Sequence, residues 1–235
     1  MGIKFSRLIR RAGFMLSKGR EYKQDFHISG FKPPVRKNDI YDHLNSLYWH
    51  AMEARPEYLV ELGTRGGEST KVLLCAARDL DVKMLSVDIN DCGGIEVDDK
   101  GRWTFIQSDD VEFGQRGFQE WCHENNLSSK AGFVFIDTSH LYDHTRAEID
   151  VWVKNLALGG TMIFHDTNMG NVYARLDGSL GYGWDNNRGV IRAIEDLLGR
   201  RYDENAFFVD YAAGFLIRHY PNCSGMTVIK KMAVL

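Results

Sequence analysis

Short apolar runs alternate with stretches of helical periodicity from residue 58 onward. Five runs with the length and composition of buried strands lie at 58–62, 83–89, 103–107, 132–136 and 161–165. The segments between and around them carry apolar residues at helical spacing, which predicts helices at about 40–53, 68–77, 112–124, 143–155 and 190–198. Strands that alternate with helices indicate βαβ units and a mostly parallel sheet.

Two further strands are predicted at the end of this pattern, over 206–211 and 214–219. Only Ala212-Ala213 separates them, and so short a link permits an antiparallel hairpin but no crossover. The expected fold is therefore α/β and Rossmann-like, with a mostly parallel seven-stranded sheet, a terminal antiparallel hairpin and helices on both faces. Ligands of such sheets bind beyond the carboxyl ends of the strands.

Charge divides the chain into two parts. Residues 1–40 carry a net charge of +7, and the remainder carries −10. We therefore predict a basic N-terminal arm or cap over 1–40, helical over 3–16, and one main domain over 41–235. The arm is expected to pack in a homo-oligomer or cover the site, with contact to an anionic membrane surface as the alternative. The acidic body argues against binding of nucleic acid.

The cellular compartment is predicted from two further features. The chain has no secretory signal and no apolar run of membrane-spanning length. Its four cysteines are scattered without a CxxC pair, which is typical of free thiols in a reducing compartment. The expected location is the cytoplasm.

A glycine-rich turn follows the first predicted strand and opens the next helix. Its spacing from Gly63 is G-x-x-G-G rather than the G-x-G-x-x-G of dinucleotide sites, and acids flank it at Glu61 and Glu68. Such a turn suits a cationic ligand better than a pyrophosphate. Asp88 ends the second strand, 25 residues after Gly63, where a carboxylate can accept the hydroxyls of a ribose.

These motifs resemble those of class I S-adenosylmethionine-dependent methyltransferases. An acidic strand end with a glycine-rich turn corresponds to their first motif, and an acid that ends the second strand corresponds to their second. The resemblance implies that the turn packs against the methionine part of the cofactor and that residues after the third strand lie near the adenine. The implied cofactor-binding residues are Glu61, Gly63, Thr64, Gly67, Ser69, Asp88, Ser108, Asp109 and Asp137.

Acids and histidines end the fourth and fifth strands, which should be neighbours in the sheet. Asp137, Asp166 and Asn168 would offer hard oxygen ligands in one pocket, and such ligands suit Mg²⁺ or another divalent cation. His140 and His165 lie beside them, and histidine is the usual general base near neutral pH. We expect His140 to be the base, with His165 as the second candidate.

This stretch also resembles the group that contains macrocin O-methyltransferase and cephalosporin-hydroxylase-like proteins. The residues that fit are Asp137, His140, Tyr142, Gly160, His165 and Asp166, together with Gly189-Val190 and Arg192-Ala193 at the start of a later helix. Members of that group often hold a divalent cation with strand-end acids. The chain departs from the pattern at Thr138, where glycine is frequent, and at Thr167, where an acid or asparagine is frequent.

The predicted function is metal-assisted O-methylation of a small hydroxylated molecule, a sugar or a natural product. The polar and aromatic loop 167–188 is long enough to serve as a lid or an acceptor-binding segment. Two alternatives remain at this point. One is an oxidoreductase or hydroxylase-like or NAD-binding enzyme with the same fold, and the other is a non-catalytic module at a membrane surface.

Overall fold

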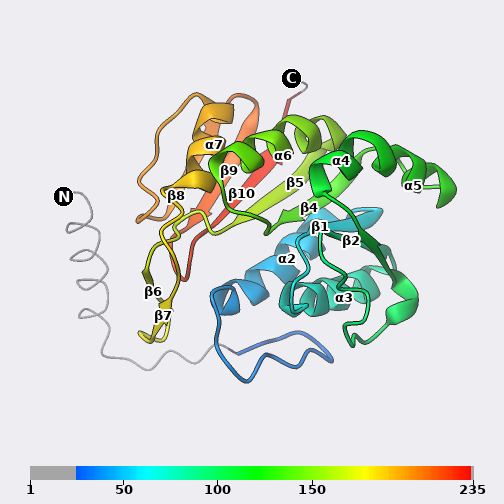
Figure 1. Ribbon diagram of the computed structural model, residues 1–235, viewed down its shortest axis with the longest axis horizontal. Helices are drawn as coiled ribbons and strands as arrows, with labels where there is room; N and C mark the ends of the chain where they lie inside the picture. The colour runs from blue at the N-terminus through cyan, green and yellow to red at the C-terminus, as the bar shows by residue number, and fades with distance from the viewer. Residues whose placement is uncertain (1–24, 234–235) are drawn as a thin grey trace.

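A computed structural model describes residues 25–233 of the chain (Figure 1). The helix predicted over 3–16, and with it the proposed contacts of the arm, lies outside the described residues. The helical elements are η1 (Tyr41–His43), α2 (Leu44–Ala54), α3 (Glu68–Leu80), η2 (Lys100–Arg102), α4 (Asp110–Glu112), the π-helical η3 (Phe113–Gly117), α5 (Phe118–Glu124), α6 (Tyr142–Asn155) and α7 (Gly189–Leu198). The strands are β1 (Tyr58–Leu62), β2 (Lys83–Asp88), β3 (Trp103–Gln107), β4 (Ala131–Ile136), β5 (Leu156–His165), β6 (Val172–Ala174), β7 (Leu180–Tyr182), β8 (Phe208–Ala212), β9 (Phe215–Tyr220) and β10 (Met226–Lys231).

The described residues form one large sheet in the order β3-β2-β1-β4-β5-β10-β9-β8. The first five strands in this order are parallel, and β10, β9 and β8 are antiparallel. The predicted α/β, Rossmann-like fold and its terminal hairpin are thereby confirmed. The sheet has eight strands in this part of the chain rather than seven, because β10 enters between β5 and β9.

Helices cover both faces of the sheet, as Figure 1 shows. On one face, α5, α6 and α7 bury a core that includes Phe118, Trp152 and Ile194. On the other face, α2 and α3 bury a second core that includes Leu47 and Leu73. The central strands β1 and β4 are buried on both faces, which is why their sequences read as short, largely apolar runs, whereas the edge strand β3 is mostly half-buried. All four cysteines are free and buried.

The loop predicted over 167–188 contains a small hairpin of its own, β6 paired antiparallel with β7. Arg175, which is only 7% exposed, fixes this hairpin to the segment before η1. Its guanidinium donates to the carbonyls of Lys37 (2.6 Å) and Asn38 (3.2 Å), and Asp42 accepts a hydrogen bond from the Leu176 N–H. Residues 37–42 are therefore bound to the main domain, whereas the sequence predicts a domain boundary at residue 40.

No helix among residues 25–233 is long and apolar enough to cross a membrane.

Candidate functional site

The site lies where the strand order reverses, between the carboxyl ends of β1 and β4. Gly63 follows β1 with a φ of +89°, and a Cβ built on it would lie 2.1 Å from the carbonyl oxygen of Asp137. Only glycine fits both this backbone conformation and this close approach. The Asp137 N–H in turn donates to the carbonyl of Leu62 (2.8 Å). The glycine turn and the acid after β4 are thus in direct backbone contact.

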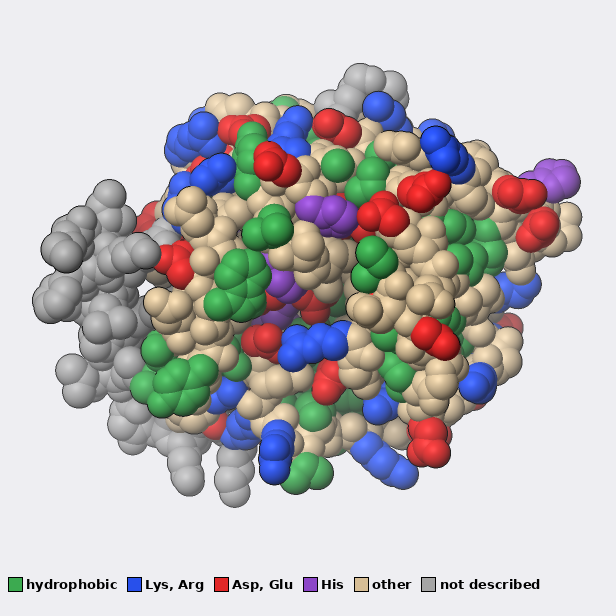
Figure 2. Space-filling view, in the orientation of Figure 1, with side chains coloured by type: hydrophobic (Ala, Val, Ile, Leu, Met, Phe, Trp, Pro, Cys, Tyr) green, Lys and Arg blue, Asp and Glu red, His purple; other side chains and the backbone are tan. Residues whose placement is uncertain are grey.

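A cavity of about 660 Å³ opens at this point. The space-filling view shows histidine and acidic side chains in a hollow near the centre of this face, with a basic side chain at its rim (Figure 2). The cavity is lined by Gly63, Arg65, Val87, Asp88, Ile89, Asn90, Cys92, Asp109, Asp110, Asp137, Thr138, Ser139, His140 and His144. Its volume is in the range of pockets that enclose a nucleoside-sized ligand.

Asp88 lies on the cavity wall at the end of β2, as predicted, and its carboxylate shapes the glycine turn. Oδ2 accepts from the N–H groups of Thr64 (2.8 Å) and Arg65 (3.1 Å), and Oδ1 accepts from the backbone and side chain of Asn90. Burial raises the pKa of Asp88, but these donors outweigh burial and hold the pKa below its usual value. Four N–H groups therefore donate to the Asp88 carboxylate and occupy its acceptor sites. Because Asn90 is exposed, ribose hydroxyls could bind to Asp88 in place of the two Asn90 N–H groups.

Glu61 lies beneath the turn rather than on the cavity wall. Its side chain is fully buried, and Oε2 accepts hydrogen bonds from Thr70 (2.8 Å) and Ser86 (2.6 Å). Oε1 is buried without a hydrogen-bond partner. Burial raises the pKa of Glu61 to about 7, although hydroxyl donors, Ser69 among them, oppose the increase. Glu61 and Ser69 therefore support the turn from below, whereas the sequence resemblance implies direct contact with the cofactor.

The buried Glu61 predicts a pH-dependent stability. Because folding raises its pKa, the favourable contribution is complete below the unfolded value of about 4.5 and is lost as the pH rises through about 7. We expect the ligand-free protein to lose roughly 3 kcal/mol between pH 4.5 and pH 8 relative to Glu61→Gln, which cannot ionise. Chemical denaturation of both proteins across this range measures the difference. Parallel stability curves for the two proteins would contradict the prediction.

His165 joins the two predicted metal-binding acids. Its Nδ1 lies 3.2 Å from Asp137 Oδ1 and 3.3 Å from Asp166 Oδ1, and its side chain is 1% exposed. Burial alone would lower the pKa of His165, but the charges of Asp166 and Asp137 raise it well above its usual value. In return, the imidazolium outweighs burial and lowers the pKa of Asp137 to about 2. His165 therefore lies in the sheet interior as a counter-charge, away from the cavity wall.

His140 is placed for contact with a ligand, since it lines the cavity and its side chain is 16% exposed. Its Nε2 lies 3.1 Å from Asp166 Oδ2 and 4.0 Å from Asp137 Oδ1. Both His140 (φ +58°) and Asp166 (φ +56°) have left-handed backbone conformations, which cost energy in residues other than glycine. Strain of this kind persists where the surrounding structure fixes the geometry, as it does at functional sites.

The donor set fits a divalent cation. Asp137, His140 and Asp166 each offer one ligand atom, and these atoms lie within 4.8 Å of one another. The side-chain amide of Asn168, the predicted third ligand, donates to the carbonyl of Pro221 (2.9 Å), and the Asn168 N–H donates to Ser224. Asn168 therefore packs against the loop before β10 and not against the two acids. The residue that lies beside Asp137 and Asp166 is His140.

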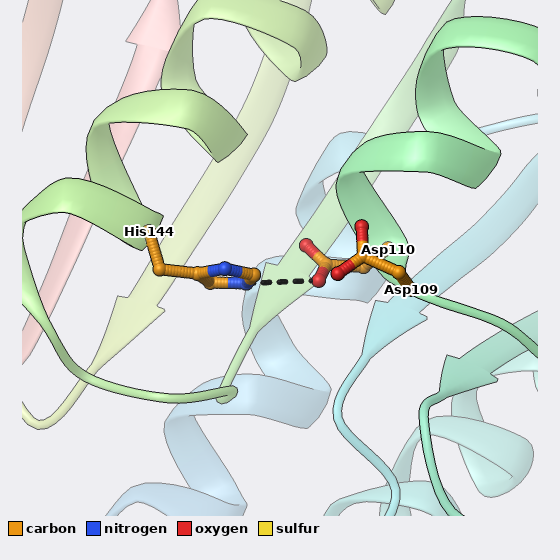
Figure 3. Close-up of side chains that lie close together, drawn as sticks. All are labelled: Asp109, Asp110 and His144. Carbon is orange, nitrogen blue, oxygen red and sulfur yellow. Dashed lines mark hydrogen bonds and ion pairs between the residues drawn. The ribbon is translucent and has the colours of Figure 1, made fainter.

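A second polar cluster, formed by Asp109, Asp110 and His144, also lines the cavity (Figure 3). His144, from the first turn of α6, points across to the start of α4, where its Nε2 lies 2.9 Å from Asp110 Oδ1. Asp109 adjoins them and caps α4 by accepting from the Glu112 N–H. Buried Glu148 lies 3.6 Å from the same imidazole nitrogen. The contact with Asp110 raises the pKa of His144, so an ionised pair stabilises this wall.

The predicted residues fall into two groups. Gly63, Asp88, Asp109, Asp137 and His140 line the cavity. The remainder are not among the residues that line it and belong to the turn or the strand ends around it: Glu61, Thr64, Gly67, Ser69, Ser108, His165, Asp166 and Asn168.

The cavity residues that were not predicted include three with charged or basic side chains, Arg65, Asp110 and His144. A signal for His144 exists in the sequence, since it follows His140 by four residues at the start of a predicted helix. Arg65 is a basic residue inside an otherwise acidic motif.

The sequence and the structure of the chain are similar to those of known methyltransferases. Residues 60–167, just under half of the chain, match a family model described as a methyltransferase domain. This segment begins in β1 and ends after β5, so it contains the glycine turn, Asp88 and both strand-end acids. No curated protein has a sequence that matches the chain.

Several solved structures share the fold. An O-methyltransferase from Bacillus cereus, in complex with SAH, aligns with a TM-score of 0.53 and 14% identity over 85% of this chain and 84% of its own. A putative caffeoyl-CoA O-methyltransferase from Staphylococcus aureus aligns with a TM-score of 0.52 and 13% identity, over 84% of this chain and 85% of its own. The O-methyltransferase TomG from Streptomyces achromogenes, in complex with SAM, aligns with a TM-score of 0.51 and 14% identity, over 86% of this chain and 82% of its own. At these identities the similarity establishes the fold.

Proposed function

We propose that this chain, whose residues 60–167 match a methyltransferase domain, is a class I, S-adenosylmethionine-dependent enzyme that methylates a hydroxyl oxygen of a small molecule with the help of a divalent cation. The observation that carries the proposal is the shared wall at the sheet switch point. There the glycine turn of the cofactor pocket meets a pair of strand-end acids and a partly exposed histidine. Solved structures with the same fold include O-methyltransferases, which supports transfer to oxygen.

The cavity suits the cofactor by shape and by charge. Gly63 lines the cavity where the turn after β1 meets Asp137, and Asp88 stands at the end of β2, where a ribose can reach it. Asp109, after β3, is placed for the adenine end. The acidic wall favours the positively charged sulfonium of S-adenosylmethionine. The same features disfavour NAD, whose pyrophosphate would meet this negative charge.

Asp137 and Asp166 would hold the cation, because their carboxylates converge beside His140. Hard oxygen ligands of this kind suit Mg²⁺, which needs few protein ligands. When bound there, the cation would lower the pKa of an acceptor hydroxyl. His165 keeps the two carboxylates together from behind and fixes their orientation.

His140 would remove the proton of the acceptor. Its Nε2 faces the two carboxylates, so an acceptor oxygen near them lies within reach of the imidazole. Once Nε2 has taken the proton, the charge of Asp166, 3.1 Å away, stabilises the imidazolium. The main contribution of the protein is alignment, since methyl transfer needs the acceptor oxygen in line with the bond between sulfur and the methyl group.

The β6–β7 hairpin and the residues after it would bind the acceptor. The ring of Trp184 lies 6.3 Å from the ring of His140 and is 43% exposed, and Tyr182 at the end of β7 is 90% exposed. The exposed ring of Trp184 beside the proposed base offers a face on which a sugar or another ring can pack. This arrangement supports a hydroxylated ring compound as the acceptor.

Binding of S-adenosylhomocysteine by the isolated protein tests the proposal. The unchanged protein should bind it in a titration calorimeter. Asp88→Ala should weaken binding about 10- to 100-fold, because it removes the ribose acceptor and releases the Thr64 and Arg65 N–H groups. Asp91→Ala, a change of a neighbouring exposed acid, is the matched control and should bind normally. An unchanged dissociation constant for Asp88→Ala would refute the assignment of this pocket to the cofactor.

A further inference from the structure

The start of α7 lies against the loop that carries His140. Gly189 is the first residue of this helix and is buried. A Cβ built on Gly189 would lie 2.5 Å from the carbonyl oxygen of His140 and 2.9 Å from the backbone nitrogen of Tyr142. Both atoms belong to the main chain, which cannot move aside as the end of a flexible side chain can. Gly189 does not have a left-handed backbone conformation, so the close contact itself calls for a glycine here.

Side chains join the same two segments, and α6 and α7 pack against each other (Figure 1). The guanidinium carbon of Arg192 lies 4.5 Å from the centre of the Tyr142 ring, and the Tyr142 hydroxyl donates to Asp196 (2.6 Å). The ring of Trp184, on the segment that leads into α7, lies 6.3 Å from the ring of His140. The loop that carries His140 is thus held at several points by α7 and the residues before it.

Arg188, the residue before Gly189, anchors the start of α7. Its Nε donates to Glu204 (2.9 Å) and its Nη2 to Glu195 (2.8 Å). The side chains of these two glutamates are 4% and 0% exposed. Arg188 has a φ of +57°, and His140 on the other side of the contact has a φ of +58°. Strain on both sides of one contact indicates a geometry that the surrounding structure fixes, as functional sites require.

We infer that Gly189 and Arg188 are positioning residues for the proposed base. The inference rests on the proposed function, because it concerns the residue that would remove the acceptor proton. Gly189 and Arg188 are not among the residues that line the cavity, and they act through the backbone of His140. A displacement of a reacting group by about 1 Å can lower a rate about 100-fold, and a base must lie within hydrogen-bond reach of the proton that it removes.

Substitution of Gly189 by alanine tests the inference. Alanine favours a helix more than glycine does, so a loss in Gly189→Ala comes from the added Cβ. We expect kcat to fall about 10- to 100-fold, with the affinity for S-adenosylhomocysteine unchanged. Gly101→Ala in η2 is the matched control, since Gly101 also lacks a left-handed conformation and a Cβ there meets open space. This control should be fully active.

A double-mutant cycle separates positioning of the base from a general structural role. If Gly189 acts through His140, its substitution has no further effect once the base is gone. The double variant Gly189→Ala/His140→Ala should therefore be as active as His140→Ala alone. Arg188→Lys keeps the charge beside the two glutamates but loses the guanidinium fork, and it should give a smaller loss with the same dependence on His140. Arg188→Lys decides the test if Gly189→Ala fails to fold.

Three results would overturn the inference. Losses that add in the double variant would assign Gly189 to the general stability of the fold. An unchanged kcat in Gly189→Ala, or in Arg188→Lys where that variant decides, would show that the contact does not position the base. If His140→Ala itself keeps full activity, the proposed base is wrong and the inference fails with it.

Discussion

Replacement of His140 by alanine should lower kcat about 10²- to 10⁴-fold and leave the affinity for S-adenosylhomocysteine unchanged. The partly exposed imidazole is the proposed base, and its Nε2 lies 3.1 Å from Asp166. Without it, the acceptor hydroxyl loses its proton to water alone. The measurement is the rate of S-adenosylhomocysteine release with an acceptor that the unchanged enzyme methylates, together with calorimetry of the variant.

The backbone at His140 decides which variants are informative. Its φ of +58° is tolerated by asparagine better than by most other residues, so His140→Asn keeps the loop and removes the base. This variant should be as inactive as His140→Ala. His123→Ala, on the exposed side of α5, is the matched control and should be fully active. A loss below tenfold in both His140 variants would show that another group removes the proton.

Removal of divalent cations should abolish turnover, and Mg²⁺ should restore it. We expect chelation by EDTA to lower the rate roughly 100-fold or more, since a cation on the acceptor oxygen contributes several kcal/mol to the transition state. Asp166→Asn should have the same effect even with added Mg²⁺. The amide retains the size of the side chain and tolerates the φ of +56°, but it removes the charge that would hold the cation.

The cluster of Asp109, Asp110 and His144 provides the control for this experiment. Its ligand atoms also lie within 4.8 Å of one another, so a cation could in principle bind there. Binding of Mn²⁺, followed by electron paramagnetic resonance, should be lost in Asp166→Asn and retained in Asp110→Asn. Full activity of Asp166→Asn in EDTA would show that the strand-end acids serve only the structure.

The parallel half of the fold could be predicted closely because its signals are local. The boundaries of β1 and β3 agree with the predicted runs, since each strand is a short, mainly apolar segment that is followed by turn residues. The later strands were harder. The segment Met226–Lys231 is short and ends in two lysines, and only pairing with β5 and β9 makes it a strand. The β6–β7 hairpin, likewise, depends on the Arg175 contacts to residues distant in sequence.

The candidate site was predictable in location but less so in detail. Strand-end residues of a parallel sheet meet at one edge, so the convergence of Asp137, Asp166 and His140 follows from the topology. Sequence position alone does not tell on which side of a turn a side chain lies. For this reason the sequence did not predict that Glu61 is buried beneath the turn or that His165 is buried behind the acids. The role of Asp110 depends on packing of α4 against α6, which no local pattern encodes.

The contacts of Arg175 bear on where the protein can be shortened. A chain that begins at residue 41, the predicted start of the main domain, lacks the Lys37 and Asn38 carbonyls that anchor the guanidinium. It also lacks the ion pair between Lys37 and Asp177 in the β6–β7 connection. A chain that begins at residue 25 retains all of these contacts. Crystallisation and activity work on a trimmed protein should therefore start before residue 37, so that the proposed acceptor-binding hairpin keeps its anchor.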